Sequence, residues 1–358
     1  MLFDRSYILG KQMKKVKKNN INKLIVILYS EAKKEYFATH EAYLTEVDVF
    51  PRSKIIKKHL KKLGYKVILL PGNFSSIKKT AFLKPRVVFN LVDSICGNET
   101  LTSLIPAALE SFSIPYTGAG ATSLAINSDK YLTKIILKQC GVPVPGFQLF
   151  TNEKQKLDSS IHFPFIVKLN ESHGSLEINQ NSIVENEKDL RKRIKFLIDK
   201  YKQSVLVEEY IFGKEITALM IDGVKESQFL FAEERIFLKK EKYPLYSYDA
   251  SWGEKEIYDV LQYELNKKMK DDIIKVFKTL QFIDYGRFEI IIDKKGKYFF
   301  IDSNANPEFG PYPETGGPFA YLLHVNNISF DFVTKIIIKN SINRFKNKKN
   351  LLTNQNNN

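Results

Sequence analysis

The sequence contains few of the residues that build disulfides or zinc sites. Cys96 and Cys140 are the only cysteines among 358 residues, and they lie far apart and in no metal-type spacing. The five histidines are scattered and form no HExxH pattern, which argues against a zinc centre. We therefore expect a reduced, cytoplasmic protein.

Long hydrophobic runs are also missing. The longest apolar stretches, such as "KLIVILY", suit buried strands and fall short of the ~18 residues that a membrane span needs. The lysine-rich N-terminus is not followed by the apolar stretch of a secretory signal. The sequence therefore predicts no membrane partner.

Negative charge is in the minority. The chain has 40 acidic against 55 basic residues, a net charge of +15. A nucleic-acid binder would gather this charge on one face or stripe, whereas the lysines here are spread over nearly every segment. We expect no nucleic-acid partner, although a basic field favours an anionic nucleotide that enters a cleft.

The pattern of predicted strands and helices changes near residue 121. Residues 22–120 alternate short apolar strands with helical patterns, which predicts a parallel sheet covered on both faces. Residues 121–345 carry strand pairs with helices between them, which is typical of an α+β domain. Residues 1–21 and 346–358 are polar, and we expect a flexible N-terminus and a disordered tail.

The last strand pair, "YGRFEIIIDKKGKYFFIDSN", places polar side chains together. A two-residue loop at Lys295 and Gly296, or a four-residue loop at 294–297, gives one register. In that register Glu289 faces Asp302 and Arg287 faces Asn304, all on one side of the hairpin. The predicted core face consists of Phe288, Ile290, Ile292, Phe299 and Ile301.

Two carboxylates in direct register repel each other, so they need a proton or a cation. Two acids and an amide oxygen form a set that suits Mg²⁺ bound partly by phosphates of a nucleotide. The alternative is a solvated hairpin face whose acids meet nearby lysines. Phosphate-binding groups elsewhere in the chain would favour the first interpretation.

Candidate phosphate ligands precede this hairpin. Lys168 ends the strand "FPFIVK" and is followed by Gly174 and Ser175, so its ammonium and the N–H groups of a small-residue loop could hold phosphate together. Lys130, near the start of a helix, is a second candidate cation. The pattern GxxxxGK[ST] is absent, which excludes a P-loop.

The order of these motifs resembles a known family. "IPYTGAG", "SDKYLTK", "FPFIVK", a Gly-Ser loop, "VLVEEYIFGKEIT", "YGRFEIIID" and "FIDSNANP" follow one another as in the D-alanine–D-alanine ligase branch of the ATP-grasp superfamily. The similarity covers residues 22–345. It implies an N-terminal α/β lobe followed by an ATP-grasp fold of two α+β subdomains, about 121–205 and 206–345, with ATP between them.

The resemblance assigns roles to the motif residues. Lys130 and Lys168 would contact phosphates, Gly174 and Ser175 would belong to a mobile glycine-rich loop, and Glu215 would hold the ribose. Adenine would lie against Glu208, Glu209, Tyr210 and Ile211. Seen without the family, Tyr210 and Ile211 equally suit a buried core.

The implied catalytic residues are Arg287, Lys168 and Ser175. Mg²⁺, with Mn²⁺ as an alternative, would bind Glu289, Asp302 and Asn304, and Arg287 would stabilise a tetrahedral intermediate. The implied reaction is ATP-dependent, ADP-forming ligation of a carboxylate to an amine through an acyl phosphate. The substrates would be small amino acids or carboxylates, and family members are commonly homodimers.

The substrate end departs from the family pattern. The family's Gly-Gly-x-Ser turn and substrate-binding acid are missing, and Glu46 or Asp48 would have to replace that acid if neither is simply a solvated loop residue. "NANPEFGPYPETGGPFA" lacks the Ser-Leu pair that contacts the second substrate, which leaves Thr315 and Gly316 as candidates. These losses favour an amino-acid or dipeptide ligase of specialised metabolism over D-alanine–D-alanine synthesis for the cell wall.

Two departures concern the phosphates. In "YSYDASWGEKE" Trp252 keeps the aromatic residue of the family, but Ser251 replaces a phosphate-contacting lysine, for which Lys255 is a candidate substitute. Glu177 replaces the last glycine of the glycine-rich loop, which would slow its closure. These changes keep open a degenerate nucleotide-binding protein without ligase activity as the alternative function.

Overall fold

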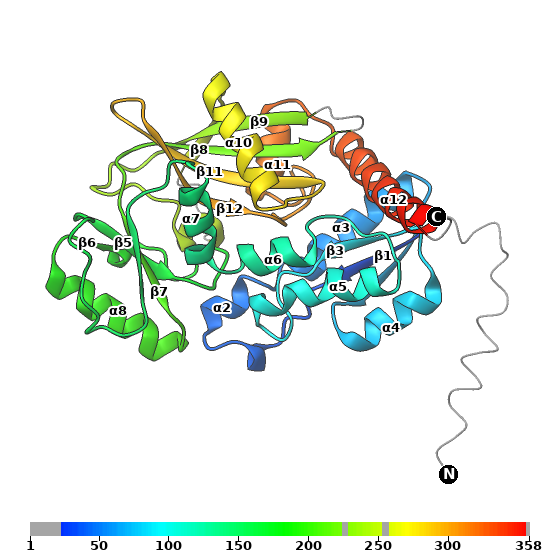
Figure 1. Cartoon of the computed structure of the whole chain (residues 1–358), viewed down its shortest axis with the longest axis horizontal. Coiled ribbons are helices and arrows are strands. Elements are labelled where there is room, and N and C mark those ends of the chain that lie inside the picture. The colour runs from blue at the N-terminus through cyan, green and yellow to red at the C-terminus, as the bar shows by residue number, and fades with distance from the viewer. Residues whose placement is uncertain (1–22, 224–227, 253–257, 356–358) are drawn as a thin grey trace, which may run out of the picture.

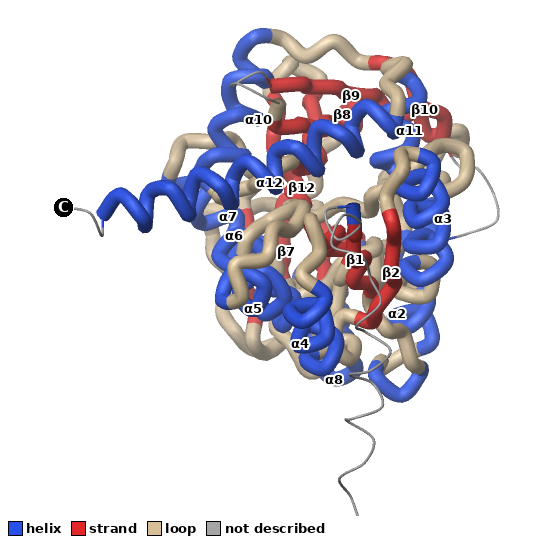
Figure 2. Tube along the Cα trace, turned by 90° about the vertical axis from the view of Figure 1, so that its right-hand side faces the viewer, coloured by secondary structure: helices blue, strands red, loops and turns tan. Residues whose placement is uncertain are grey.

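The structure is a computed structural model that describes residues 23–223, 228–252 and 258–355. In this part of the chain, the strands form a three-stranded, a four-stranded and a five-stranded sheet, with helices packed on their faces (Figure 1, Figure 2). None of the helices in these segments is both long enough and apolar enough to cross a membrane.

The N-terminal lobe contains the three-stranded sheet, and its strands are parallel. Its helices pack on both faces: α3 shares a core with one side of the sheet, and α4 and α5 share a core with the other. The strands, in spatial order, are β2 (Lys66–Pro71), β1 (Leu24–Tyr29) and β3 (Val87–Leu91). The helices are η3 (Lys34–Tyr36), α2 (His40–Leu44), α3 (Val49–Lys62), α4 (Phe74–Leu83), η4 (Glu99–Ser103) and α5 (Leu104–Ser111). The parallel α/β lobe predicted from the apolar runs is therefore present.

The four-stranded sheet is antiparallel and is covered by α8 (Glu187–Tyr201) on one face (Figure 1). Helix α8 begins after Asn186, whose side chain accepts the Asp189 N–H, and it buries Leu190, Ile194 and Leu197 against the sheet. The elements, with strands in spatial order, are β4 (Phe147–Phe150), β7 (Val205–Glu209), β5 (Phe165–Leu169), β6 (Ile183–Val184) and the short η5 (Gln180–Ser182).

The five-stranded sheet has all its strand pairs antiparallel. Its strands, in spatial order, are β10 (Tyr258–Gln262), β9 (Gln228–Phe237), β8 (Gly213–Asp222), β11 (Tyr285–Asp293) and β12 (Tyr298–Asn304). One face shares a core with α6 (Ala121–Asn127), α7 (Lys130–Gln139) and α10 (Lys267–Thr279). Part of the other face shares a core with the N-terminal lobe, α11 (Pro318–Val325) and α12 (Phe330–Gln355). Short α9 (Tyr248–Trp252) lies between β9 and β10 in the chain.

The last hairpin has the predicted register at its polar end and a different turn. Glu289 pairs with Asp302 and Arg287 with Asn304, but the register shifts by one residue after Glu289. The loop has three residues, 294–296, because Gly296 adopts φ 78° and its N–H donates to the Asp293 carbonyl. A bulge at Ile301 compensates for the odd loop.

This bulge corrects the predicted core face. Tyr298 and Phe300 are 6% and 1% exposed and pack in the core with Phe288 and Ile290. Phe299 and Ile301, which the sequence placed in the core, are only partly buried. The prediction assumed a regular hairpin without a bulge. One extra residue in a strand moves every side chain beyond it to the opposite face of the sheet.

Two boundaries also differ from the sequence expectation. Strand β7 pairs with β4 and β5, so the four-stranded sheet ends at Glu209 rather than at residue 205. Helix α12 continues to Gln355, past the predicted start of a disordered tail at residue 346, because neither proline nor glycine interrupts this segment. Residues 1–22 and 356–358 lie outside the described segments.

Candidate functional site

A cleft of about 590 Å³ lies where the two antiparallel sheets and the N-terminal lobe meet. This volume falls within the roughly 300–1,000 Å³ of small-molecule sites. Every residue that the sequence predicted to bind nucleotide or metal lines the cleft, as do the substrate candidates Trp252, Thr315 and Gly316. Glu46 does not line it.

Two lysines hold one buried carboxylate at the four-stranded side of the cleft. Glu208 on β7 is 1% exposed, and its two oxygens lie 2.8 Å from Lys168 Nζ and 3.2 Å from Lys134 Nζ. Lys134 also donates to the Ile301 carbonyl at 3.1 Å, which joins α7 to β12. Burial lowers the pKa of Lys134 to about 8. Burial also opposes the charge on Lys168, but the carboxylates of Glu208, Asp302 and Glu289 together raise its pKa.

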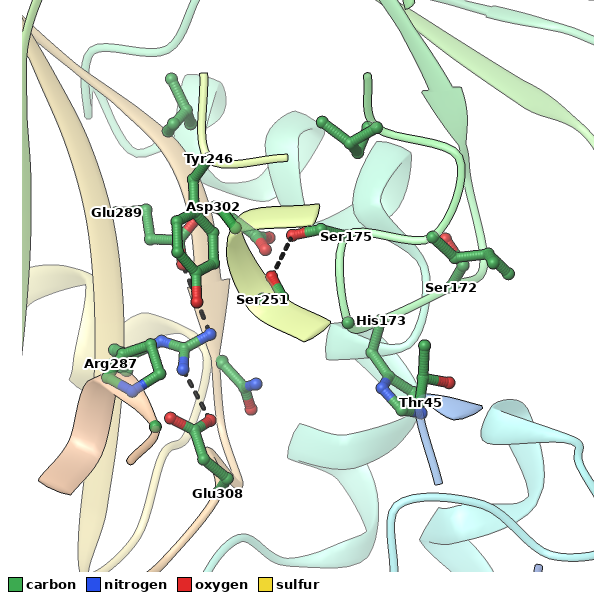
Figure 3. Close-up of a pocket in the computed structure, with 18 of the residues that line it drawn as sticks. Thr45, Ser172, His173, Ser175, Tyr246, Ser251, Arg287, Glu289, Asp302 and Glu308 are labelled. Carbon is green, nitrogen blue, oxygen red and sulfur yellow. Dashed lines mark hydrogen bonds and ion pairs between the residues drawn. The ribbon is translucent and has the colours of Figure 1, made fainter. Parts of the chain in front are cut away.

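The glycine-rich loop, defined here as residues 172–177, borders the same region. Lys130 Nζ donates to the Ser172 carbonyl. From α9, Ser251 Oγ lies 3.3 Å from Ser175 Oγ (Figure 3). Trp252 Nε1 donates to the Gly174 carbonyl at 2.9 Å. Lys255, the predicted substitute for the missing lysine, lies outside the described residues.

Glu177 fastens the end of this loop to α8. Its carboxylate lies 3.2 Å from Arg193 Nη2 and 2.8 Å from Lys200 Nζ, and it accepts the Tyr201 hydroxyl at 2.8 Å. Although burial opposes it, this set of donors lowers the pKa of Glu177. Glu177 has φ 62°, a conformation that glycine adopts without strain. Glutamate at position 177, where the family has glycine, therefore anchors the end of the loop to α8.

The hairpin β11–β12 presents its predicted polar face to the cleft. Glu289 and Asp302 lie directly opposite each other, and Glu289 Oε1 is 3.3 Å from Arg287 Nη2 (Figure 3). Asp302 makes no ion pair or hydrogen bond with another described residue. Lys168 Nζ reaches across the cleft to the Ile301 carbonyl, 3.5 Å away, so the lysine and the acid-bearing strand face one another.

This donor set fits a divalent ion bound partly by a substrate. A free carboxylate, a second carboxylate in register and the Asn304 amide supply oxygen ligands for a hard cation such as Mg²⁺. In the described part of the chain, no group of three or more His, Cys, Asp or Glu side chains could hold a metal without help.

The connector between β7 and β8 forms the opposite wall. Tyr210 and Ile211 line the cleft beside apolar groups that include Ile166 and Ile291. Glu209 turns its carboxylate to the N–H groups of His162 and Gly146, at 2.8 and 3.1 Å. Such a wall offers apolar surface to a flat base.

Glu215 and Arg235 form a buried ion pair behind this wall. Glu215 Oε1 lies 2.5 Å from Arg235 Nη1, and the guanidinium stacks under Tyr246 at 3.9 Å from the ring centroid. Burial raises the pKa of Glu215 despite this pairing. Glu233, two residues before Arg235 on β9, is 1% exposed, and neither of its oxygens has a hydrogen-bond partner among the described residues. Burial raises its pKa to about 7.

Arginine–carboxylate pairs dominate the end of the cleft nearest the N-terminal lobe. Arg287 Nη1 lies 2.6 Å from Glu308 Oε2 (Figure 3). Arg52 Nη2 lies 2.9 Å from Asp93 Oδ2. Asp48 and Thr315 line the cleft beside these pairs. Burial raises the pKa of Asp93 to about 7.

The candidate acid Glu46 has a different place from the one expected. Its side chain is 1% exposed, and its Oε1 lies 3.0 Å from Nε2 of His173 in the glycine-rich loop, with Glu99 on the same nitrogen at 3.7 Å. Burial opposes protonation, but Glu99 and Glu46 raise the pKa of His173 to about 10. Glu46 follows the end of α2 and is thus neither a solvated loop acid nor a residue that lines the cleft, since its buried side chain pairs with His173.

Comparison with known proteins gives the family. The sequence model of the family described as "D-ala D-ala ligase C-terminus" matches residues 136–320, more than half of the chain. The chain belongs to this family. It is a member of the D-alanine–D-alanine ligase-like branch of the ATP-grasp proteins, as the motif order predicted.

Sequence relatives of this ATP-grasp chain share about a quarter of their residues with it. A D-alanine–D-alanine ligase of Aquifex aeolicus is 28% identical over 257 residues, which cover 71% of this chain and 83% of that protein. The chain is 29% identical over 226 residues to "Uncharacterized protein y4sG" of Sinorhizobium fredii. That match covers 62% of this chain and 65% of the other, slightly under two thirds of its length.

Solved structures share the fold at lower identity. The D-alanine–D-alanine ligase of Bacillus anthracis complexed with ATP has a TM-score of 0.67 and 18% identity, and covers 91% of this chain and 99% of its own. The corresponding ligase of Coxiella burnetii has a TM-score of 0.65 and 16% identity, with 94% and 99% covered. The predicted ATP-grasp fold is confirmed.

Sequence reasoning missed several residues that line the cleft or pair with residues that line it. Lys134 follows Lys130 by one helical turn, so the helical spacing could have indicated it. Glu308 lies four residues beyond Asn304, in the segment already known to lack the family's substrate motif. Arg235 and His173 carry no local signal, because each joins the site through a long-range pairing.

Proposed function

We propose that this ATP-grasp protein is a D-alanine–D-alanine ligase-like enzyme that joins a carboxylate to an amine at the expense of ATP and releases ADP and phosphate. The observation that carries the proposal is the position of the Asp302 carboxylate. It lies opposite Glu289, shares the cleft with Lys168 and makes no hydrogen bond or ion pair with another described residue. Names of sequence relatives support the same reaction type.

ATP would bind between the two antiparallel sheets. Tyr210 and Ile211 would contact the base with Glu208 and Glu209 beside them, and Glu215, held by Arg235, would accept the ribose hydroxyls. Lys130, Lys168, Gly174 and Ser175 would surround the phosphates. Lys134 keeps Glu208 and Lys168 in place, so it acts as a positioning residue.

The metal ligands would be Glu289, Asp302 and Asn304. Mg²⁺, or Mn²⁺ in its place, neutralises charge on the transferring phosphoryl group when bound. The protein would hold Glu289 and Asp302 side by side before the metal binds, because the pairing of β11 with β12 fixes their relative position.

The reaction balances in two steps. An oxygen of the donor carboxylate attacks the γ-phosphorus of ATP, which gives an acyl phosphate and ADP. The amine then attacks the acyl carbon, phosphate leaves with the donor's oxygen, and the amine loses a proton. Arg287, permanently charged and 12% exposed, would stabilise the oxyanion of the tetrahedral intermediate.

The substrates are small molecules, and the donor carries the reacting carboxylate. Amino acids are the first candidates because several sequence relatives are named D-alanine–D-alanine ligase. We place the reaction in the cytoplasm, as the low cysteine content predicts, and a homodimer is the assembly expected of the family.

A hydroxamate assay tests the proposal before the amine substrate is known. The protein is incubated with ATP, Mg²⁺, hydroxylamine and each member of a panel of L- and D-amino acids and simple carboxylates. Hydroxylamine intercepts an acyl phosphate as a hydroxamate, so a donor should yield ADP and hydroxamate in equal amounts. Tight nucleotide binding without ADP from any acid would favour the degenerate binding protein instead.

A further inference from the structure

Glu308 occupies two groups that would otherwise bind a carboxylate of a substrate. Its Oε2 lies 2.6 Å from Arg287 Nη1, and its Oε1 accepts the N–H of Phe319 at 3.0 Å. Arginine and a helix N-terminus are the two groups in proteins that best suit a carboxylate. Arg287 and the first residues at the start of α11, Gly317 and Pro318, line this cleft. Glu308 thus occupies both groups with one side chain of the protein itself.

The surroundings of Glu308 are built for this arrangement. Gly317, the N-cap of α11, has no side chain to cap the helix, and Glu308 supplies the acceptor in its place. A Cβ atom on Gly317 would lie 2.8 Å from Glu308 Cγ and 3.0 Å from its Oε1. Although burial opposes ionisation, Arg287 and the Phe319 N–H lower the pKa of Glu308, so it stays a carboxylate.

Arg287 has no pair of adjacent N–H donors left to bind a further carboxylate. Its Nη1 faces Glu308 and its Nη2 faces Glu289 at 3.3 Å, while Nε is buried without a hydrogen-bond partner among the described residues. A bidentate arginine–carboxylate pair needs two adjacent donors on one edge. A substrate carboxylate would have to displace Glu308 and leave it unpaired.

Nearby charges disfavour another anion as well. Arg52, the next cation in the cleft wall, lies 2.9 Å from Asp93 and 3.6 Å from Asp48. Each of the two arginines thus faces two carboxylates: Glu308 and Glu289 at Arg287, and Asp93 and Asp48 at Arg52. An additional carboxylate would be repelled, whereas the ammonium or amine of a substrate would be attracted.

We propose that Glu308 takes the place of a substrate carboxylate, so that the amine substrate of this ligase carries no carboxylate beside its amino group. This inference rests on the proposed function and specifies its acceptor. Glu308 uses one acceptor site on each oxygen, and its side chain is 26% exposed, so capacity remains to receive N–H groups of the amine. Monoamines and diamines are the class that fits.

Matched pairs of acceptors test this inference. Each pair differs only in the α-carboxylate: ethylamine and alanine, ethanolamine and serine, 1,5-diaminopentane and lysine, tyramine and tyrosine, with both enantiomers of each amino acid. The donor is any acid that yields a hydroxamate. The amide product is identified by mass, and kcat/KM is measured for both members of each pair.

The wild-type protein should favour the carboxylate-free member of the best pair by at least tenfold. Glu308→Ala vacates the Arg287 and Phe319 donors and should shift that ratio at least tenfold toward the amino acid. Glu308→Gln keeps an acceptor for Phe319 and should shift it less. Glu314→Ala, an exposed acid on the same segment, should leave the ratio unchanged.

The outcomes separate the two proposals. Hydroxamate formation with a wild-type preference for the amino acids overturns the inference and leaves the ligase function standing. A ratio that does not change in Glu308→Ala overturns the inference in the same way. The absence of hydroxamate with every acid overturns the ligase function and the inference together.

Discussion

His173 Nε2 lies 3.0 Å from Glu46 Oε1, so an ion pair joins the glycine-rich loop to the N-terminal lobe. Glu99 adds a second carboxylate from the same lobe at 3.7 Å. The N-terminal lobe thus holds the glycine-rich loop over the cleft through ion pairs, and both carboxylates that face His173 belong to the lobe.

This ion pair predicts a pH dependence of stability. Glu99 and Glu46 raise the pKa of His173 to about 10 in the folded protein, from roughly 6.5 in an unfolded chain. The folded state therefore binds the proton more tightly, and its stabilisation is full below about pH 6.5 and lost as pH rises toward 10. Melting temperature across this window should fall for the wild type.

The variant His173→Gln isolates that contribution. It should lose roughly 1.5–3 kcal/mol of the free energy of unfolding near pH 6.5 and show a flatter pH profile above it. His162→Gln, at an exposed histidine, serves as the matched control. Equal pH profiles for wild type and His173→Gln would show that the ion pair does not form in solution.

Lys134 supports the phosphate side of the cleft. Lys134→Met removes one of the two cations on buried Glu208 and should lower the free energy of unfolding by roughly 3 kcal/mol, measured by chemical denaturation. Nucleotide affinity should fall as well, because Lys168 would then be the only lysine that neutralises Glu208 and would be less available to a phosphate. Lys138→Met, exposed on the same helix, should change neither quantity, and equal losses in both variants would contradict the role of Lys134.

Glu177 should control the motion of the glycine-rich loop. Glu177→Gln weakens the ion pairs to Arg193 and Lys200, a loss of roughly 1.5–3 kcal/mol in the local closing free energy. Hydrogen exchange of the loop amides should then accelerate about tenfold or more. Glu185→Gln, whose carboxylate forms an exposed pair with Lys242, is the control, and unchanged exchange in Glu177→Gln would refute the anchor.

Asp302 should be needed for chemistry more than for folding. Asp302→Asn removes a carboxylate that lies opposite Glu289 and has no hydrogen bond to another described residue, so we expect stability to be unchanged or slightly higher. Turnover should fall at least ~100-fold, and the dependence of nucleotide binding on Mg²⁺ should weaken in a metal titration. Asp271→Asn, on the exposed side of α10, controls for loss of a surface acid; full turnover in Asp302→Asn would remove Asp302 from the metal site.

The sequence predicted the architecture because its signals are local and periodic. The short apolar runs of residues 22–120 predicted the parallel sheet of the N-terminal lobe directly. The register of Glu289 and Asp302 also followed from alternation. The bulge at Ile301 did not, because a three-residue loop and a bulge together conserve the register at the polar end.

Other parts of the candidate site were less predictable for a physical reason. Glu46, Arg235 and Glu308 act through partners distant in the sequence, His173, Glu215 and Arg287. Pairings of this kind depend on how lobes pack and leave no periodic trace in the chain. The family pattern showed what was missing there, and only the structure shows which side chain fills the space.

Transfer of oxygen from the donor to phosphate tests the central claim most directly. The donor acid that gives the most hydroxamate is labelled with ¹⁸O in its carboxylate and incubated with the protein, ATP, Mg²⁺ and an amine. If the carboxylate attacks ATP in this cleft, each released phosphate carries one oxygen atom from the donor, and Asp302→Asn suppresses the signal. Phosphate that contains oxygen only from ATP and water would contradict the account.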